Sequence, residues 1–157
     1  MSGTDWAARV RDARAEDLPA IVALYADDAL GSTREQPGLP LAEGYTRAFA
    51  ELDADPRHRL VVVEDDGAVV ATLQLSFLPH LVRQGTERAQ VEAVRVAAGH
   101  RGSGLGRALI GWAVDQAREH GCGLVQLTTD ATRPDAHRFY ESLGFRASHV
   151  GMKLALS

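Results

Sequence analysis

The sequence predicts one α/β domain over residues 1–157, in which a mixed β-sheet is flanked by helices. The first observation behind this prediction is a pair of apolar, β-branched runs, 59–64 and 68–78, separated by Asp65-Asp66-Gly67. An Asp-Gly pair between two such runs predicts a β-hairpin. The second observation is a glycine-rich turn that joins a third run, 88–96, to a stripe of apolar residues at helical spacing. A short strand follows that helix, so an antiparallel meander leads into a strand–helix–strand unit.

The N-terminal part predicts a short strand over 8–14 and then two helices. Glu16 and Asp17 precede the first helical stripe, and acidic residues favour a helix start because they complement its dipole. Glycines and prolines within 30–40 predict a loop. The second helix ends before Asp55-Pro56, because the residue before proline avoids the helical conformation. Its apolar stripe consists of Tyr45, Ala48, Phe49 and Leu52.

The C-terminal part predicts a long helix, a short buried strand, another helix and a final strand. Gly121 is expected to end the long helix. Gly144 is expected to end the shorter one, which begins at Pro134. Phe145 would then pack back on Tyr140. The expected ranges are a loop over 79–87, a helix over 105–119, a strand over 124–129 and a last strand or strand pair over 145–155.

Composition and charge exclude several classes of protein. The formal net charge is −4, which argues against nucleic acid as an electrostatic partner. No apolar run approaches the length that spans a membrane, and the N-terminus has no signal-peptide core. Cys122 is the only cysteine, so no intrachain disulfide can form. We therefore expect a cytoplasmic protein that binds neither nucleic acid nor a membrane.

The glycine-rich turn after residue 96 is the most informative chemical feature of the chain. Gly102, Gly104 and Gly106 stand at every second position, which allows a tight turn with positive φ angles. Successive N–H groups in such a turn can face one concavity, and the following helix N-terminus favours the same negative charge. Arg101 and Arg107 flank the turn with guanidinium groups that match phosphate. The pattern predicts a binding site for a pyrophosphate or a similar anion.

Two common phosphate motifs do not fit this turn. A P-loop requires Gly-Lys-Ser/Thr at its end, and that triplet is absent. The dinucleotide pattern G-x-G-x-x-G/A fails from Gly102, where its last position is Arg107, and from Gly104, where it is Leu109. Asp130 at the end of the next apolar run would imitate the ribose-binding acid of that fold, so the dinucleotide interpretation keeps some support. A turn after the third strand of a meander nevertheless counts against it.

The spacing that fits is Arg101-x-x-Gly104-x-Gly106. It resembles the acyl-CoA loop of the GNAT N-acetyltransferase superfamily, Gln/Arg-x-x-Gly-x-Gly/Ala. A second motif, residues 133–145, resembles the closing helix of that family, which ends in an aromatic residue, Tyr, Glu, two residues and Gly-Phe. The predicted element order is similar to this family over nearly the whole chain. The resemblance implies the GNAT acyl-CoA N-acyltransferase fold, with a central mixed sheet of about six to seven strands and about four helices.

The resemblance also implies acetyl-CoA as the cosubstrate. By this resemblance, backbone groups of Val94 and Val96 pair with the pantetheine arm, and N–H groups of residues 101–106 hold the pyrophosphate. The family often has Asn near the start of the closing helix, where this chain has Arg133, so the contact there is open. The full set expected at the cofactor is Val94, Arg95, Val96, Arg101, Gly102, Ser103, Gly104, Leu105, Gly106, Arg107 and Arg133.

Glu92 and Tyr140 are the candidate catalytic residues. In the family, a Glu at the position of Glu92 often serves as the base, commonly through water. Strand parity puts Glu92 on the same face as Val94 and Val96, where a carboxylate is explained if that face lines a cleft. The alternatives are a solvent-facing position at the sheet edge or a surface salt bridge with Arg95 or Arg88. Tyr140 would protonate the CoA sulfur, although its ring also fits simple packing against Phe145.

The leading hypothesis is transfer of an acetyl group from acetyl-CoA to a primary amine by direct attack. A noncatalytic CoA-binding or sensory module with this fold is the runner-up, and a nucleotide-dependent enzyme is the third. The acceptor, a small molecule or a peptide, is not specified; the acidic first helices would suit a cationic amine, but such faces are usually only solvated. The six histidines lack ligand spacing, so no metal is expected. His80 lies where an acceptor could enter, and the resemblance allows a homodimer.

Overall fold

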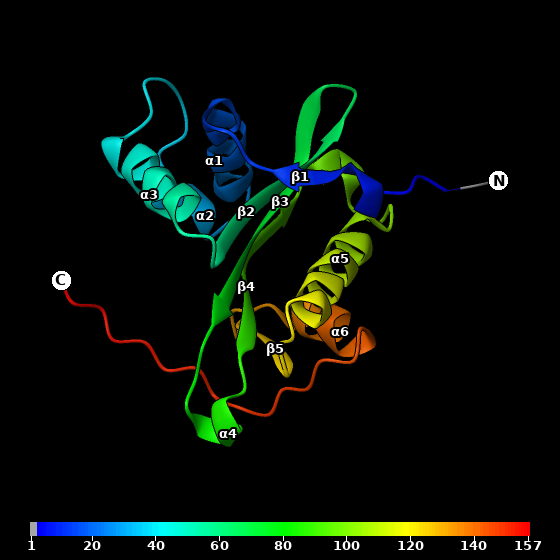
Figure 1. The fold of residues 1–157 in the computed structure, drawn as a ribbon. Coiled ribbons are helices and arrows are strands. Elements are labelled where there is room, and N and C mark those ends of the chain that lie inside the picture. Colours follow the sequence, from blue (N-terminus) through cyan, green and yellow to red (C-terminus); the bar gives the residue numbers. More distant parts are fainter. Residues whose placement is uncertain (1–2) are drawn as a thin grey trace. The chain divides into compact units, whose positions relative to one another are not determined.

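In the computed structural model, which describes residues 3–157, five strands form one sheet in the order β1-β2-β3-β4-β5 (Figure 1). The first four strands pair antiparallel along the meander. The strands are β1 (Val10–Asp12), β2 (His58–Asp65), β3 (Ala68–Leu78), β4 (Arg88–Val96) and β5 (Leu124–Leu127). The helices are α1 (Leu18–Ala26), α2 (Gly31–Arg34), α3 (Glu43–Ala54), α4 (Val82–Gly85), α5 (Leu105–Glu119) and α6 (Pro134–Ser142), with 3-10 turns η1 (Ala7–Arg9), η2 (Ala15–Asp17) and η3 (Ala98–His100). The α/β class and the order of its main elements are therefore as predicted.

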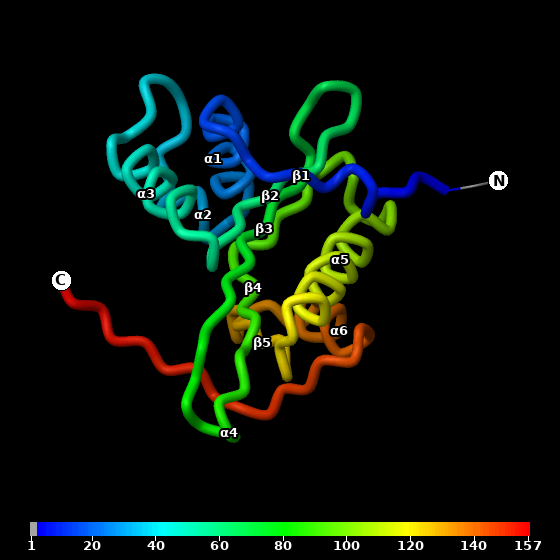
Figure 2. Tube along the Cα trace, viewed as in Figure 1, coloured from blue at the N-terminus to red at the C-terminus, as the bar shows by residue number. Residues whose placement is uncertain are grey.

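The chain divides into two compact units, one up to Gln126 and the other Leu127–Ser157. In the first unit, α1 and α3 lie on one side of the sheet and α5 on the other (Figure 1). Figure 2 traces the β3–β4 connection, which carries α4, as a long excursion beyond the ends of the two strands. Each unit is described by itself below.

The core beneath α1 shows why the first helix forms where the sequence predicts it. Leu18 and Ile21 are buried against Val62 of β2. Asp17, just before the helix, is 7% exposed and accepts hydrogen bonds of 2.7 and 2.9 Å from the Arg11 guanidinium of β1. These bonds hold the pKa of Asp17 below its usual range. The pair ties the start of α1 to the edge of the sheet, because a buried carboxylate without its partner would be costly.

Both predicted glycine stops are confirmed. After α5, the Gly121 N–H donates to the Arg118 carbonyl and the Cys122 N–H to the Ala117 carbonyl. After α6, the Gly144 N–H donates to the Glu141 carbonyl at 3.0 Å, and the Phe145 N–H to the Tyr140 carbonyl at 3.1 Å. These are the two bonds of a Schellman motif, and both glycines have the positive φ that it requires.

The prediction of a last strand or strand pair over 145–155 is wrong, and the sheet has five strands rather than six to seven. A strand needs a partner for its backbone groups, and an alternating pattern predicts only which side chains would share a face. In this segment the Ser148 N–H bonds locally to the Arg146 carbonyl. The apolar side chains of the alternating pattern are exposed: Val150, Met152, Leu154 and Leu156.

Candidate acyl-transfer site

A β-bulge in β4 determines how the site is arranged. Glu92 pairs with Gln74 of β3, and Arg95 pairs with Thr72, so two residues of β4, Ala93 and its neighbour, oppose one residue of β3. Ala93 has a φ of 54°, an uncommon conformation for a residue with a side chain. Because the extra residue shifts the alternation by one, the two halves of β4 follow opposite parity.

The parity argument made for Glu92 from the sequence is therefore wrong. Glu92 and Arg95 share the face that looks toward α1 and α3, whereas Val96, which pairs with Ala71, is on the opposite face. Glu92 is exposed, which agrees with the solvent-facing alternative. Its carboxylate accepts a hydrogen bond of 2.8 Å from the Gln90 amide, and within residues 3–157 it forms no ion pair with Arg88 or Arg95. The salt-bridge alternative is wrong as well.

The turn between β4 and α5 offers three of the six N–H groups that were expected from residues 101–106, because the other three donate within the protein. Gly102 and Gly104 have φ angles of 78° and 85°, and Gly104 immediately precedes α5. Within the described residues, the N–H groups of Gly102, Gly104 and Gly106 have no intramolecular acceptor. The Ser103 hydroxyl donates to the His100 carbonyl and so braces the turn. Unpaired amides at the start of a long helix favour an anion.

A network of charged and aromatic groups anchors the residues that precede this turn. His100 shares a hydrogen bond of 2.9 Å with Asp65, which belongs to the β2–β3 hairpin region. Arg9 donates to the other oxygen of Asp65 at 2.7 Å, and the Trp6 ring contacts His100 edge-on. The hydrogen bond to His100, with the one from Arg9, lowers the pKa of Asp65. The residues just before the turn are therefore fixed by Asp65, the last residue of β2.

The arginines expected at the cofactor lie in different surroundings. Arg95 forms an ion pair of 3.2 Å with Asp28, two residues after the end of α1, lies over the Tyr25 ring and donates to the Val94 carbonyl. Burial raises the pKa of Tyr25 to about 12. Arg101 is exposed and donates to the Val96 carbonyl at 3.3 Å. Arg107 is exposed on the first turn of α5.

A row of neutral polar side chains beside Glu92 was not predicted from the sequence. The Gln126 amide of β5 donates to Gln90 at 2.9 Å, so a chain of amides leads to the Glu92 carboxylate. On the same face, Ser76 of β3 shares a hydrogen bond of 2.7 Å with His58 of β2. The signal was present: Thr72, Gln74 and Ser76 alternate with apolar residues in an otherwise apolar strand.

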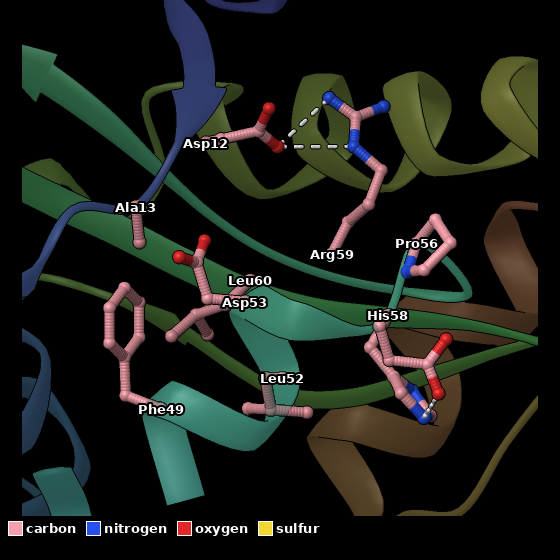
Figure 3. A pocket seen from close by; sticks show the side chains of 10 residues that line it. Asp12, Ala13, Phe49, Leu52, Asp53, Pro56, His58, Arg59 and Leu60 are labelled. Atoms are coloured by element: carbon pink, nitrogen blue, oxygen red, sulfur yellow. Dashed lines mark hydrogen bonds and ion pairs between the residues drawn. The ribbon is translucent and has the colours of Figure 1, made fainter.

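Two adjoining cavities lie where the end of α3 meets this face. The first, of about 360 Å³, is lined by Ala48, Glu51, Leu52, Asp55, His58 and Gln74. The second, of about 290 Å³, shares Leu52, Asp55 and His58, and Figure 3 shows Phe49 and Leu52 of α3 on one side of it and the Arg59–Asp12 ion pair across from them. Gln74 pairs with Glu92 across the strands. The first cavity, which we call the α3 pocket, is therefore next to Glu92.

The C-terminal unit carries the remaining candidates. Tyr140 is half-buried in α6, with its ring centroid 5.1 Å from that of Phe139 and 5.8 Å from that of Phe145. The expected packing of Phe145 on Tyr140 is thus confirmed. Arg133 directly precedes α6, its side chain is exposed, and its own carbonyl accepts the Ala136 N–H at 3.1 Å. Because the two units are separate bodies here, the roles of Tyr140 and Arg133 rest on chemistry and resemblance.

His80 and Cys122 are the other side chains that the sequence singled out. His80 bonds to the Leu78 carbonyl at 2.9 Å in the loop after β3. Burial, with Glu87 nearby, raises the pKa of the Cys122 thiol, so it is a poor nucleophile at neutral pH. Residues 3–157 contain no group of three or more His, Cys, Asp or Glu that could hold a metal ion. None of the described helices combines the length and apolarity needed to cross a bilayer.

Comparisons with known proteins agree with this geometry. The family model described as "Acetyltransferase (GNAT) family" matches residues 18–145. The chain is 29% identical to the aminoalkylphosphonate N-acetyltransferase of Salmonella typhimurium, over 94% of this chain and 90% of that protein. It is 36% identical to the glucosamine 6-phosphate N-acetyltransferase of Trypanosoma brucei brucei, over 66% of this chain and 72% of that protein. A crystal structure of a transcriptional regulator from Bacillus halodurans C-125 is 46% identical, with a TM-score of 0.91 over 94% and 98% of the chains.

Proposed function

Because this chain belongs to the GNAT acetyltransferase family and is an N-acetyltransferase, we propose that it transfers an acetyl group from acetyl-CoA to a primary amine by direct attack. Glu92 accepts the proton of the amine, and the turn between β4 and α5 holds the cofactor. The acceptor approaches from the α1 and α3 side of the sheet. The names of the two relatives denote amines that bear a phosphonate or a phosphate, and neither is carried over to this chain.

The residues of the turn fit the cofactor. The open amides of Gly102, Gly104 and Gly106 suit a pyrophosphate, and the guanidinium groups of Arg101 and Arg107 would balance its charge. Backbone groups of β4 at Val96 and at Val94, which the bulge leaves out of the pairing with β3, would pair with the pantetheine arm. Leu105, which is fully buried, anchors the first turn of α5 beneath them. When bound, acetyl-CoA supplies an activated thioester.

The chemistry asks the protein for two proton transfers. An alkylammonium has a pKa of about 10 and must lose a proton before its nitrogen can attack. Glu92 takes this proton, directly or through one water, and Gln90 orients its carboxylate. The reaction forms one N–C bond and breaks one C–S bond. Tyr140 gives its phenolic proton to the leaving sulfur, so that CoA departs as a thiol, which is a better leaving group than the thiolate.

The observation that carries this proposal is the continuity of β4. A carboxylate, a bulge and a turn with open amides follow one another from Glu92 to Gly106 on a single segment. An anion held at the turn and an amine at Glu92 would therefore be bound by the same segment, at the two ends of the stretch that begins at Glu92 in β4 and ends at the first turn of α5. No second segment has to be positioned to bring them together.

A pH–rate series on Glu92→Gln tests the assignment of the base. In the wild type, kcat/KM should fall on the acidic side as the carboxylate gains a proton. The variant should lose that acidic limb, and its activity should grow as pH approaches the pKa of the amine, about 10. Glu119→Gln, an exposed acid at the end of α5, is the matched control and should keep the wild-type profile. An unchanged profile in Glu92→Gln would assign the base elsewhere, with His80 the next candidate.

A second candidate function is a sensor that binds CoA without turnover. The relative described as a transcriptional regulator, at 46% identity, favours it. Both functions require cofactor binding at the turn, so binding alone does not separate them. Release of CoA in the presence of a panel of amines does: the sensor predicts binding of acetyl-CoA with no amine-dependent thiol release.

A further inference from the structure

The α3 pocket, taken as the acceptor site proposed above, has a charge that selects among amines. Its lining contains two carboxylates, Glu51 and Asp55, and no lysine or arginine. Asp55 is engaged by Arg57, whose guanidinium donates to both carboxylate oxygens at 3.0 and 3.2 Å. These bonds hold the pKa of Asp55 below its usual range. Asp55 is therefore ionised and already partnered at neutral pH.

Because Arg57 occupies Asp55, Glu51 is the carboxylate of the pocket that is left to bind a ligand. It lies on α3 one turn before Asp55, it is exposed, and within residues 3–157 its carboxylate has no ion pair. Gln74 is the other uncommitted polar side chain of the lining: it is half-buried, and the described part of the chain provides its amide with no hydrogen-bond partner. The pocket thus offers one carboxylate and one amide, with Ala48 and Leu52 as apolar walls.

The position of the pocket relative to Glu92 sets the shape of the acceptor. Gln74 is directly opposite Glu92 on the neighbouring strand, and side chains in such pairs lie about 5 Å apart. An amine at Glu92 would therefore place the rest of its molecule over Gln74 and toward Glu51. A second group a few carbon atoms from the reacting amine would lie in the pocket and meet the Glu51 carboxylate.

We infer that this protein acetylates amines that carry a second positive charge, such as diamines, and discriminates against amines that carry a phosphate or phosphonate. An anion in the pocket would face Glu51 and Asp55 with no lysine or arginine among the lining residues to receive it, and juxtaposed like charges are strongly unfavourable. A second ammonium group would meet Glu51 instead. Glu51 is then a specificity residue, and Gln74 a neutral hydrogen-bonding group for either kind of acceptor.

Three four-carbon amines test this selectivity: 1,4-diaminobutane, butylamine and 4-aminobutylphosphonate. We expect kcat/KM, followed by CoA release, to be highest for the diamine and lower for the phosphonate by at least about tenfold. Glu51→Gln should reduce the preference for the diamine over butylamine by about threefold, the size expected for an exposed charge pair. Glu51→Lys should reverse the order of diamine and phosphonate. Glu43→Gln, on the same helix but outside the pocket, should preserve the wild-type order.

Calorimetry with the same three amines and CoA-loaded protein separates this inference from the proposed function. If no amine is turned over while the diamine binds more tightly than the phosphonate, the transfer reaction is wrong and the selectivity stands. If amines are acetylated but the phosphonate equals or exceeds the diamine, the selectivity is wrong and the reaction stands. Equal losses for diamine and butylamine in Glu51→Gln would also overturn the role of Glu51.

Discussion

The turn that joins β4 to α5 and the pocket beneath α3 are built from different parts of the chain. The turn uses backbone: its donors are the amides of three glycines within five residues, and their conformation makes them available. The pocket uses side chains that come from α3, β2 and β3. A site made of backbone has a short sequence signature, whereas a site made of side chains depends on strand register and helix packing. The two should respond to different substitutions.

The largest expected effect comes from Tyr140, which belongs to neither region. Its substitution should lower kcat while the binding of both substrates is preserved. Tyr140→Phe removes the phenolic proton but keeps the ring that packs on Phe145. We expect kcat to fall roughly 10²- to 10⁴-fold, the usual contribution of a general acid or base. The Kd for acetyl-CoA and the KM for the acceptor should change little. Steady-state kinetics and calorimetry measure these quantities, and a kcat near that of the wild type would remove Tyr140 as the acid.

A smaller effect should be confined to the turn. Gly104 has a φ of 85°, which a β-branched residue adopts only with strain, so Gly104→Val should move the open amides. We expect the Kd for acetyl-CoA to rise more than about tenfold. Gly111→Val, inside α5 where an added Cβ would meet no atom within 4 Å, is the control. An unchanged affinity in folded Gly104→Val, measured by calorimetry, would place the anion elsewhere.

The smallest effect should be confined to the acceptor side. The Tyr45 hydroxyl donates to Glu35 at 2.7 Å and accepts the Gln36 N–H at 2.9 Å, so it fastens the loop that follows α2 to α3. Tyr45→Ala should release that loop and raise the acceptor KM several-fold, by about the energy of two hydrogen bonds at an exposed site. The Kd for acetyl-CoA should stay the same. If both constants changed together, the division between backbone site and side-chain site would not hold.

The same division explains how far the sequence could be interpreted. The helices, the hairpin and the two glycine stops follow from local rules, because spacing and capping act within a few residues. The final strand was predicted from an alternating pattern alone, and no partner strand pairs with it. The face of Glu92 was assigned by counting from Val96, and the bulge at Ala93 reversed the count. A bulge has no fixed sequence signature when glycine does not supply it.

The bulge also means that odd-numbered and even-numbered residues of β4 exchange faces at Ala93, so the effect of a substitution depends on which side of the bulge it lies. Before it, the odd positions Ala89 and Val91 are buried and the even position Glu92 is exposed. After it, the odd position Arg95 shares the face of Glu92 and the even position Val96 does not. Deleting Ala93 would remove the extra residue and leave a regular strand, with Glu92 still opposite Gln74 and Arg95 still opposite Thr72. Straightening the bulge while keeping every residue would instead turn one half of β4 over, so that either the Glu92 carboxylate or the start of the turn faced the α5 side of the sheet.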